Sequence, residues 1–237
     1  MKPLDVFAIA AHPDDVEQTC GGTLIKMAEM GYRTGVMDLT AGDMGTRGTP
    51  EIRIKESEDA ARILLASWRG NMRFPDARLD NTIAARMTVA GHIRMLKPRV
   101  VILPYWEARH PDHVRAGELG YDACFLAGLK KLDEDTEPHR PSKVIYSSLY
   151  ANVIPSFVVD ISAQFERRME SLFAYVSQYG SQEQGSDLFP QQTEIRDRLA
   201  SIARFYGNQI GAKYGEPFVV KETIRVDDIV TLAPRTF

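Results

Sequence analysis

Two short phrases in the sequence combine the side chains that a metal-assisted hydrolase needs. Residues 12–15 read His-Pro-Asp-Asp and residues 110–113 read His-Pro-Asp-His, so the two phrases contain three of the five histidines in the chain. Imidazoles and carboxylates bind zinc, and a carboxylate next to the ion can move a proton. Each phrase alone is also an ordinary helix start, with proline in the first turn and an acid near the N-terminus. The repetition of the phrase favours the chemical interpretation.

The elements in front of the two phrases should bring them together. An apolar run precedes each phrase and is typical of a strand buried inside a parallel sheet. Because ligand sites in such sheets lie beyond the carboxyl ends of the strands, we expect both phrases at one edge. Side chains three positions apart face the same way in a first helical turn, which pairs His12 with Asp15 and His110 with His113. A helix N-terminus favours carboxylates and neutral imidazoles, the forms that bind a metal.

The whole chain alternates between strand and helix patterns. Strands are expected at 4–11, 32–39, 69–74, 99–103, 143–150, 156–161 and 218–220, and helices from the first phrase to Gly31 and at about 51–67, 82–96, 111–129, 163–179 and 193–209. This order predicts an α/β fold, namely a Rossmann-like, mostly parallel sheet sandwiched by helices, with a small C-terminal elaboration. Because no linker divides the chain, residues 1–237 are expected to form a single domain.

Composition and charge exclude several classes of function. Of the 237 residues 44% are hydrophobic and 26% are charged, as expected of a globular protein. The net charge of −3, without a cluster of lysine or arginine, predicts no binding to nucleic acid. The apolar runs have the length of strands, well short of the roughly 20 residues of a membrane span, and the N-terminus reads as neither signal peptide nor anchor. The two cysteines, Cys20 and Cys124, form no disulfide framework, and the predicted location is the cytoplasm.

The motifs resemble those of the PIG-L/LmbE-type N-acetylglucosaminyl deacetylases. Within that family the chain looks most like the deacetylases of bacillithiol biosynthesis, which convert N-acetylglucosaminyl malate to glucosaminyl malate and acetate. Besides the two phrases, the resemblance rests on residues 38–40, 45–49 with Glu51 and Arg53, 107–113, 122–129, 158–162, 174–175 and 177–178. The Thr-Arg-Gly-Thr loop at 46–49 and the Cys-Phe-Leu-Ala-Gly-Leu helix at 124–129 are the features that point to this subgroup.

The resemblance implies a role for each side chain of the two phrases. The implied zinc ligands, two imidazoles and one carboxylate, are His12, Asp15 and His113. Three protein ligands with an open fourth position are the pattern of catalytic zinc, and iron(II) on the same ligands in the cell is left open. Asp14 is the implied general base, and His110 is the general acid or the group that stabilises the oxyanion. Asp112 is expected either to orient His110 or its neighbour, or to be a charge that favours the helix start.

The two carboxylates of the implied malate substrate call for cations in the pocket. The resemblance favours Arg53, which begins a helix just after the glycine-rich loop, because the planar fork of arginine suits a carboxylate. Arg109, next to His110, is a second candidate, with a solvated charge or an ion pair with Glu107 as the alternative. Arg47, in the glycine-rich loop, either reaches the substrate or faces solvent.

A lid and an assembly are the remaining expectations. Residues 180–192 are rich in Gln, Ser and Gly and are placed like a lid, with a disordered surface loop as the equal alternative. Several relatives offer a tyrosine from this region, but this chain has none between Tyr179 and Tyr206, so that role is not transferred. The resemblance implies a small-molecule acetamido sugar as the binding partner and a homo-oligomer, expected to be a hexamer.

Other classes of function fit parts of the pattern. A dinucleotide-binding oxidoreductase shares the strand-helix-strand opening, and Asp38 resembles a ribose-binding acid, but the acidic first turn would repel a pyrophosphate. Two histidines and a carboxylate also form the facial triad of non-haem iron oxygenases. A non-catalytic sugar-binding module would have no use for Asp14 and His110 beside a metal. The nearest alternative lies inside the family, as a deacetylase of another N-acetylglucosamine conjugate of chitobiose or mycothiol type.

Overall fold

A seven-stranded sheet forms the centre of the protein. The computed structural model describes residues 2–132, 135–148, 151–180 and 190–230. The strand order is β3-β2-β1-β4-β5-β7-β6; the first five strands pair in parallel, and β7 runs antiparallel to both its neighbours. The strands are β1 (Val6–Ala10), β2 (Thr34–Thr40), β3 (Trp68–Phe74), β4 (Val100–Pro104), β5 (Lys143–Ser147), β6 (Phe157–Asp160) and β7 (Gly215–Val219). The predicted Rossmann-like, mostly parallel sheet is confirmed.

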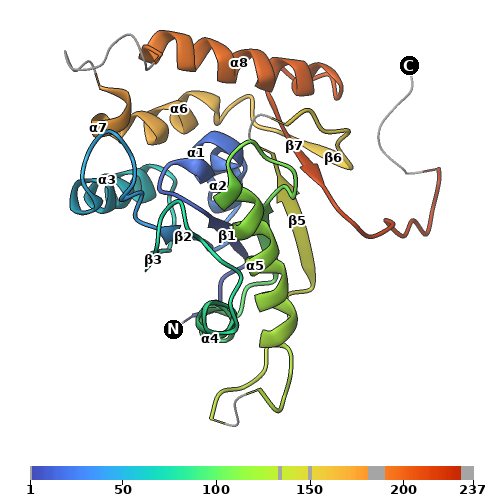
Figure 1. The fold of residues 1–237 in the computed structure, drawn as a ribbon. Coiled ribbons are helices and arrows are strands. Elements are labelled where there is room, and N and C mark those ends of the chain that lie inside the picture. Colours follow the sequence, from blue (N-terminus) through green and yellow to red (C-terminus); the bar gives the residue numbers. More distant parts are fainter. Residues whose placement is uncertain (1, 133–134, 149–150, 181–189, 231–237) are drawn as a thin grey trace.

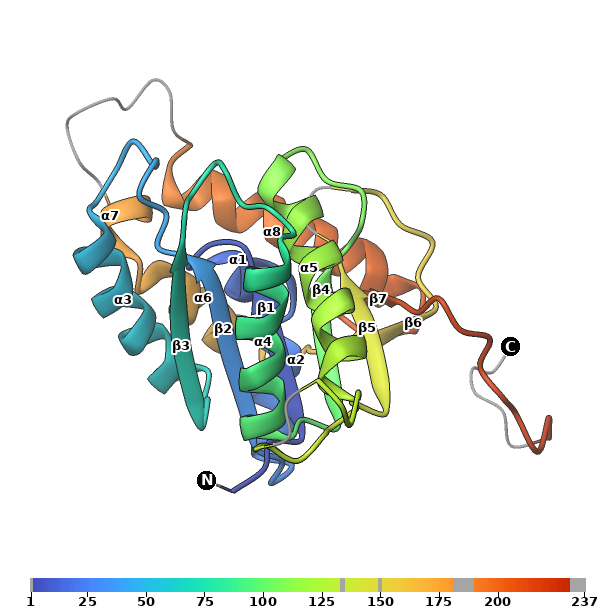
Figure 2. The ribbon, with the colours of Figure 1, turned by 60° about the horizontal axis from the view of Figure 1, so that its bottom comes forward.

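Helices cover both faces of this sheet (Figures 1 and 2). They are α1 (Asp15–Thr19), α2 (Gly21–Glu29), α3 (Pro50–Ile63), α4 (Ile83–Leu96), α5 (Pro111–Ala127), α6 (Phe165–Phe173), α7 (Val176–Tyr179) and α8 (Gln192–Asn208). On one face Ile93 of α4 and Leu119 of α5 are fully buried in the larger core cluster. On the other face Val16 of α1 and Leu24 of α2 belong to a second cluster. Helices therefore cover both faces of the sheet, and the polar residues of the two phrases lie in loops and helix starts at its carboxyl edge.

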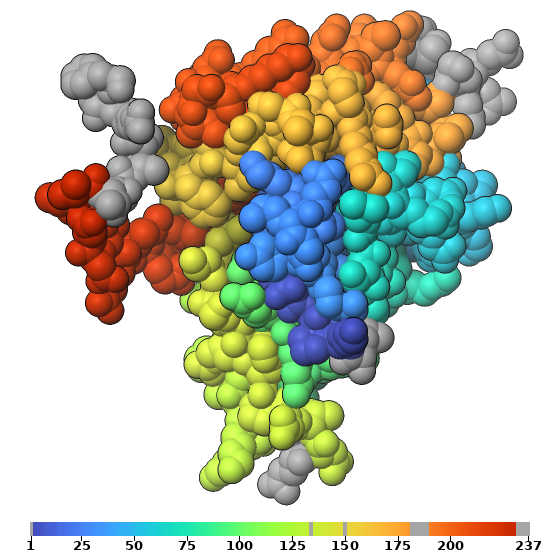
Figure 3. Space-filling view, turned by 180° about the vertical axis from the view of Figure 1, so that it is seen from behind, coloured from blue at the N-terminus to red at the C-terminus, as the bar shows by residue number. Residues whose placement is uncertain are grey.

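The last third of the chain forms the expected C-terminal elaboration. Helix α6 contacts α1, α2 and α3, and α8 contacts β6 and β7. Figure 3 shows the gold segment, which includes α6, beside the blue and cyan segments. The carboxylate of Glu216 in β7 accepts hydrogen bonds from the backbone N–H of Gly22 (2.9 Å) and Thr23 (2.7 Å) at the start of α2. After β7, the ammonium group of Lys221 lies 4.6 Å from the ring centroid of Tyr121 in α5. The described chain beyond it extends from the body and exposes Ile224, Ile229 and Val230 (Figure 2).

Two predicted helices are each divided in the structure. The helix expected from the first phrase to Gly31 breaks at Cys20, whose φ of −141° is not helical. The helix expected at 163–179 breaks at Tyr175, because the buried side chain of Tyr175 turns inward and its hydroxyl donates to Glu17 at 3.3 Å. Tertiary contacts override the continuous helical pattern at both places. The helix expected at 51–67 ends at Ile63. Strand β5 ends at Ser147, and residues 149–150 of the strand expected at 143–150 lie outside the described residues.

Among the described residues no helix is both long and apolar enough to span a membrane. The longest helices, α5 and α8, have 17 residues each. Both contain charged side chains along their length, whereas a span needs roughly 20 predominantly apolar residues.

Candidate active site

The two phrases meet at the carboxyl edge of the sheet. His12 follows β1, and residues 110–113 begin α5, which follows the neighbouring strand β4. The carboxylate of Asp15 lies between them: its Oδ2 is 3.4 Å from Nδ1 of His12, and its Oδ1 is 3.3 Å from Nε2 of His113. All three side chains are buried. The parallel topology therefore joins side chains that are far apart in the sequence.

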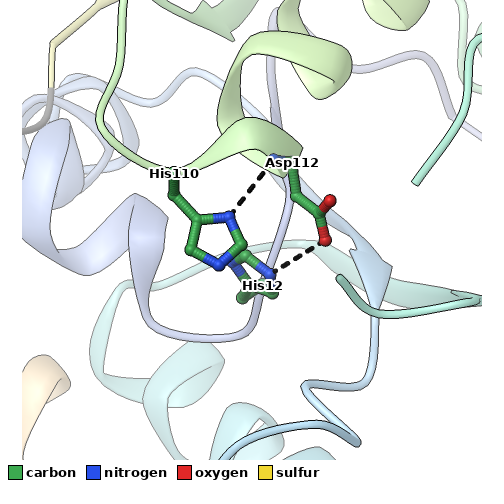
Figure 4. A group of neighbouring side chains, drawn as sticks. All are labelled: His12, His110 and Asp112. Carbon is green, nitrogen blue, oxygen red and sulfur yellow. Dashed lines mark hydrogen bonds and ion pairs between the residues drawn. The ribbon is translucent and has the colours of Figure 1, made fainter. Parts of the chain in front are cut away.

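His12, Asp15 and His113 form a group that fits a metal ion. Each residue offers a ligand atom, and these atoms lie within 4.8 Å of one another. Two imidazole nitrogens and one carboxylate oxygen suit zinc or iron(II), and catalytic sites with three protein ligands keep a position for water or substrate. In a second group, made of His12, His110 and Asp112, the possible ligand atoms also lie within 4.8 Å of one another; this group is drawn in Figure 4. The two groups share His12.

Carboxylates on the far side of His12 indicate which of its ring nitrogens would bind a metal. Its Nε2 lies 3.0 Å from Oδ1 of Asp76 and 3.5 Å from Oδ2 of Asp112. A carboxylate in this position holds the proton of a neutral imidazole on Nε2, so the free lone pair is on Nδ1, which faces Asp15. The geometry thus favours the group of His12, Asp15 and His113.

Asp76 is a site residue that the sequence pattern does not reveal. The pattern predicts only a loop at 75–80, yet the Asp76 carboxylate also accepts hydrogen bonds from the N–H groups of Met44 and Ala77, both at 2.8 Å. It is 5% exposed and therefore held in one place. The signal that could have found it is its position, because its loop follows β3 and so lies at the same sheet edge as the two phrases.

The charges of this cluster are strongly coupled. Burial opposes the charge of His12, but hydrogen bonds with Asp112, Asp15 and Asp76 raise its pKa to about 12. Burial likewise opposes the ionisation of Asp15, but His113 and His12 hold the pKa of its carboxyl well below the usual value. The same carboxylates that stabilise positive charge on these imidazoles would also favour a bound divalent cation.

Asp14 lies between two of these candidate ligands in the sequence but belongs to neither metal-binding group. Its φ of 99° is in the left-handed region, which is uncommon for residues other than glycine, asparagine and aspartate. Its Oδ2 accepts a hydrogen bond from the hydroxyl of Tyr179 at 2.7 Å, and its Oδ1 lies 3.7 Å from Nη2 of Arg53. Burial raises the pKa of Asp14 to about 7, although Arg53 opposes the shift. A buried carboxyl that titrates near neutrality suits a general base.

Helix α7 brings Tyr179 to Asp14. The backbone N–H and the hydroxyl of Ser177 both donate to the Glu56 carboxylate of α3 at 2.6 Å. The side-chain amide of Gln178 donates to the carbonyl of Arg47 at 2.7 Å, and the Arg47 guanidinium donates to the carbonyl of Gln178 at 3.1 Å. The sequence offers no tyrosine between Tyr179 and Tyr206, and Tyr179 at the border of the predicted lid is a second site residue that the sequence pattern does not reveal. Of the predicted lid at 180–192, residues 181–189 lie outside the described residues.

His110 is exposed at the rim of the site. Its Nδ1 accepts a hydrogen bond from the backbone N–H of Asp112 at 3.2 Å, which places the ring proton on Nε2 in the neutral form. Burial and the nearby His12 and His113 lower its pKa. The carboxylate of Asp112 does not orient His110; it accepts from the N–H of Ala77 at 2.7 Å and approaches His12. Asp112 thus contacts His12 (Figure 4), and it is also the acidic residue in the first turn of α5, so its position agrees with both expectations.

The three arginines predicted to bind substrate lie in different surroundings. Arg53 is buried, and its guanidinium donates to the carbonyls of Pro13 (2.7 Å) and Gly42 (3.3 Å), so it also supports the turn that holds Asp14. Arg47 is half-buried and directed to Gln178 of α7. Arg109 is exposed before α5. Arg53 is the arginine of this set that lines the polar cavity described below.

A buried ionic network supports the floor of the site. Arg69 of β3 donates to both carboxylate oxygens of Asp38 at 2.9 Å and to Glu17 of α1 at 2.6 Å. Glu17 and Asp38 are both completely buried. Both carboxylate oxygens of Asp38 are thus bound to Arg69 inside the protein. A ribose-binding acid would instead have to be accessible to a ligand. The sequence pattern does not predict the pairing of these residues across three elements.

A polar cavity of about 260 Å³ opens at this edge. It is lined by His12, Asp14, Arg53, Asp76 and His110, together with residues of the glycine-rich loop. The cavity therefore brings the Asp14 carboxylate, the exposed imidazole of His110 and the Arg53 guanidinium close to His12. This arrangement provides proton donors and acceptors around one small molecule.

A metal-dependent hydrolase needs such a combination of three ligands, a separate carboxylate and an imidazole at one opening. The chain belongs to the PIG-L family, whose profile, described as GlcNAc-PI de-N-acetylase, matches residues 7–124. It is therefore a member of a deacetylase family, as the resemblance of its motifs indicated.

Individual relatives agree with this membership. A diacetylchitobiose deacetylase of Thermococcus kodakarensis is 30% identical over 228 residues, covering 89% of this chain and 80% of the relative. A protein of Bacillus anthracis described as a probable N-acetyl-alpha-D-glucosaminyl L-malate deacetylase is 26% identical over 190 residues, covering 74% of this chain and 82% of the relative. Among solved structures, a conserved protein of Thermus thermophilus is 38% identical, with a TM-score of 0.85 over 94% of this chain and 98% of that one.

Proposed function

We propose that this protein is a metal-dependent N-deacetylase that hydrolyses the acetamide of an N-acetylglucosaminyl conjugate. The observation that carries the proposal is the group of His12, Asp15 and His113, whose ligand atoms lie within 4.8 Å of one another beside Asp14 and His110. Family membership supports the acetamide as the bond that is broken. We assign the metal site to these three residues, with zinc as the expected ion and iron(II) as the alternative in the cell.

The proposed reaction uses Asp14 for proton transfer and His110 to stabilise charge. A zinc ion on the three ligands would supply a Lewis acid and lower the pKa of a water molecule to about 7. Asp14 accepts a proton from the attacking water and then delivers it to the sugar nitrogen as the C–N bond breaks. His110, with its proton on Nε2, donates a hydrogen bond to the oxyanion that forms from the acetamide carbonyl. The products are acetate and the free amine, so one water is consumed in each turnover.

We infer that the aglycone is malate, which makes bacillithiol biosynthesis the proposed setting. The sequence motifs of the subgroup support this choice, and Arg53 in the cavity wall is a cation that could receive a carboxylate. Diacetylchitobiose is the second candidate, because the Thermococcus kodakarensis relative of that description is the more similar of the two curated relatives compared above. Arg109 and Arg47 are proposed as further contacts of the aglycone.

A substrate panel tests the function and the aglycone together. The purified protein is incubated with N-acetylglucosaminyl malate, diacetylchitobiose and free N-acetylglucosamine, and acetate and free amine are measured with and without a chelator. We expect chelator-sensitive release of both products, fastest from the malate glycoside. Fastest release from diacetylchitobiose would replace the aglycone and keep the reaction, whereas no release from any of the three would refute the deacetylase.

Asp14→Asn is the variant that separates base from ligand. It keeps the size and the backbone preference of Asp14, so we expect metal content near that of the wild type and a loss of turnover of at least about 100-fold, as for other general bases. Full turnover in this variant would contradict the role of Asp14. Arg53→Ala is a less clear test of malate recognition, because it also removes the hydrogen bond to Pro13.

We also propose an assembly and a cellular location for the protein. A homo-oligomer, expected to be a hexamer, is supported by the exposed apolar side chains of Phe125, Ile224 and Ile229. The cytoplasm is proposed because the reaction uses a small intracellular sugar conjugate in the inferred setting. Light scattering coupled to size-exclusion chromatography measures the assembly directly.

A further inference from the structure

An extended arm follows β7. We call residues 220–230, which contain neither helix nor strand, the arm. Its side chains of Ile224, Ile229 and Val230 are 58%, 81% and 89% exposed. Figures 2 and 3 show the arm in red, extending from the body of the protein. Because apolar side chains gain free energy when they leave water, the arm has the character of a segment that packs on another surface.

The first residues of the arm are held against the body. The ammonium group of Lys221 lies between 4.6 and 5.1 Å from the ring centroids of three aromatic residues, Trp106, Tyr121 and Tyr146. An ammonium group is attracted to the face of each of these rings, so together they form an aromatic cage for the lysine. The cage fixes the start of the arm and thereby the direction in which the rest of it leaves the body.

A groove of about 750 Å³ lies between the first residues of the arm and α5. Its apolar walls include Tyr121 and Phe125 of α5, Val144 of β5 and Phe157 of β6. Phe125 is 56% exposed. Sites of roughly 300–1,000 Å³ bury most of a drug-sized ligand, so the groove can accommodate several side chains of an extended segment.

Strand β5 contributes an open edge to this groove. It pairs with β4 from Lys143 to Ser147, but its described pairing with β7 is limited to Tyr146 and Ser147. On the side away from β4, residues 143–145 therefore have no strand partner in the part of the chain that the structure describes. An unpaired strand edge beside an apolar groove favours the addition of an extended segment.

The charges of the groove and of the arm tip, residues 226–230, are opposite. The charged residues that the body contributes to the groove are Arg140 and Lys143, whereas Glu222 and Arg225 of the same lining belong to the arm. The tip reads Val-Asp-Asp-Ile-Val, with two carboxylates between apolar side chains. The tip thus matches the groove in charge and in apolar character, and such complementarity selects a partner and its orientation.

We propose that the arm tip of one copy of this chain docks in the groove of a second copy, so that exchanged arms join the chains of the homo-oligomer. The start of the arm already forms one wall of the groove in its own chain, and the tip leads away from it (Figure 2). The apolar side chains of the docked tip lie against α5 and β5, and its aspartates face Arg140 and Lys143. This inference rests on the proposed assembly and is independent of the proposed deacetylase reaction.

The first test places charge on the apolar part of the tip. A variant with Ile229→Asp and Val230→Asp should keep the fold of the single chain, because both side chains are exposed. A carboxylate loses its hydration in an apolar groove, so we expect the dissociation constant of the assembly to rise at least about 10-fold. Light scattering over a dilution series measures it. The matched control is Met30→Asp, because Met30 is 62% exposed at the end of α2, on the other face of the sheet from α5, and should leave the constant unchanged.

Charge reversal tests whether the contact joins two chains. One variant carries Arg140→Glu with Lys143→Glu in the groove, and the other carries Asp227→Lys with Asp228→Lys in the tip. Each variant alone brings like charges together, so its dissociation constant should rise at least about 10-fold. An equimolar mixture should assemble as the wild type does, because each tip then meets a groove of opposite charge in the other chain. Native mass spectrometry identifies the mixed assemblies, and melting temperatures show that each variant is folded.

The outcomes separate the arm contact from the assembly and from the reaction. A wild-type protein that is monomeric at every concentration would overturn both the assembly and the arm contact, while acetate release would still measure the deacetylase. An assembly equally stable in the tip variant, the Met30→Asp control and the wild type would overturn the arm contact alone. Failure of the mixture to assemble would also overturn the exchange, because a tip that binds its own chain gains nothing from mixing.

Discussion

Asp14 combines an unusual backbone conformation with two fixed side-chain partners. Its φ is positive, and Tyr179 and Arg53 hold its two carboxylate oxygens from different elements. A general base must keep one oxygen toward the attacking water within a few tenths of an ångström. The hydrogen bond of Tyr179 therefore makes this tyrosine a positioning residue for the proposed base.

Tyr179→Phe tests that role. Loss of a hydrogen bond to a charged group costs about 1.5–3 kcal/mol, so we expect kcat to fall roughly 10-fold to 100-fold. KM and metal content should stay near the wild-type values, because Tyr179 is absent from the candidate ligand group. Steady-state kinetics and metal analysis measure the three quantities.

Tyr206→Phe is the control for the Tyr179 variant, since the Tyr206 hydroxyl bonds to the backbone of Val153 away from the site. If Tyr179 acts through Asp14, its replacement should cause no further loss in the Asp14→Asn protein. An equal loss in the wild-type and Asp14→Asn backgrounds, or a change in KM alone, would rule out the positioning role.

At the scale of elements, Arg69 fixes the relative positions of β3, β2 and α1. It pairs with Asp38 and Glu17, and the side chains of all three are at most 5% exposed. Because Glu17 belongs to α1, which begins with Asp15, the ionic network anchors the helix that carries that carboxylate. The three-way pairing thus links the core of the fold to the geometry of the candidate metal ligands.

We expect Arg69→Met to destabilise the fold strongly. Removing one partner of a buried ion pair leaves uncompensated charge and costs about 3–5 kcal/mol in the free energy of unfolding. Urea denaturation measures this change. The control is Arg62→Met, which breaks an exposed ion pair with Asp59 and should change the free energy by less than about 1 kcal/mol. Equal stability of the two variants would show that the network contributes nothing to the fold, and restoration by Glu17→Gln with Asp38→Asn would support it.

At the scale of the whole molecule, the C-terminal elaboration is joined to the sheet by polar contacts. Glu216 binds the N–H groups at the start of α2 and lies 3.3 Å from Nε of Arg168 in α6. Arg168 in turn donates to the carbonyl of Glu17 in α1 at 3.0 Å. These contacts support the proposal that residues 1–237 form one domain.

A single domain should unfold in one cooperative step. We expect differential scanning calorimetry to give one transition, with the calorimetric enthalpy equal to the van't Hoff enthalpy. Glu216→Ala should lower the melting temperature of this transition as a whole, because it leaves the buried Arg168 and two N–H groups without their carboxylate partner. Two separate transitions in the wild-type protein would instead show that the elaboration is an independent unit.

Much of this molecule could be predicted from the sequence, for identifiable reasons. The buried strands are marked by apolar runs, and the two phrases follow such runs directly, so the sheet and the meeting of the phrases follow from parallel topology. Asp76 and Tyr179 could not be assigned, because each reaches the site from a different loop or short helix and carries no motif of its own. The break at Tyr175 depends on a contact with Glu17, a partner distant in the sequence, which local periodicity does not report.

The wide sequence separation of the site residues has a consequence for biosynthesis. The candidate ligands are His12, Asp15 and His113, so no N-terminal portion that lacks α5 contains the whole group. An ion that binds this group favours chains in which β1 and β4 have already paired, and it stabilises that state by mass action. The proposed metal would then stabilise the pairing of β1 with β4 as soon as the chain extends through α5, before the C-terminal elaboration is made.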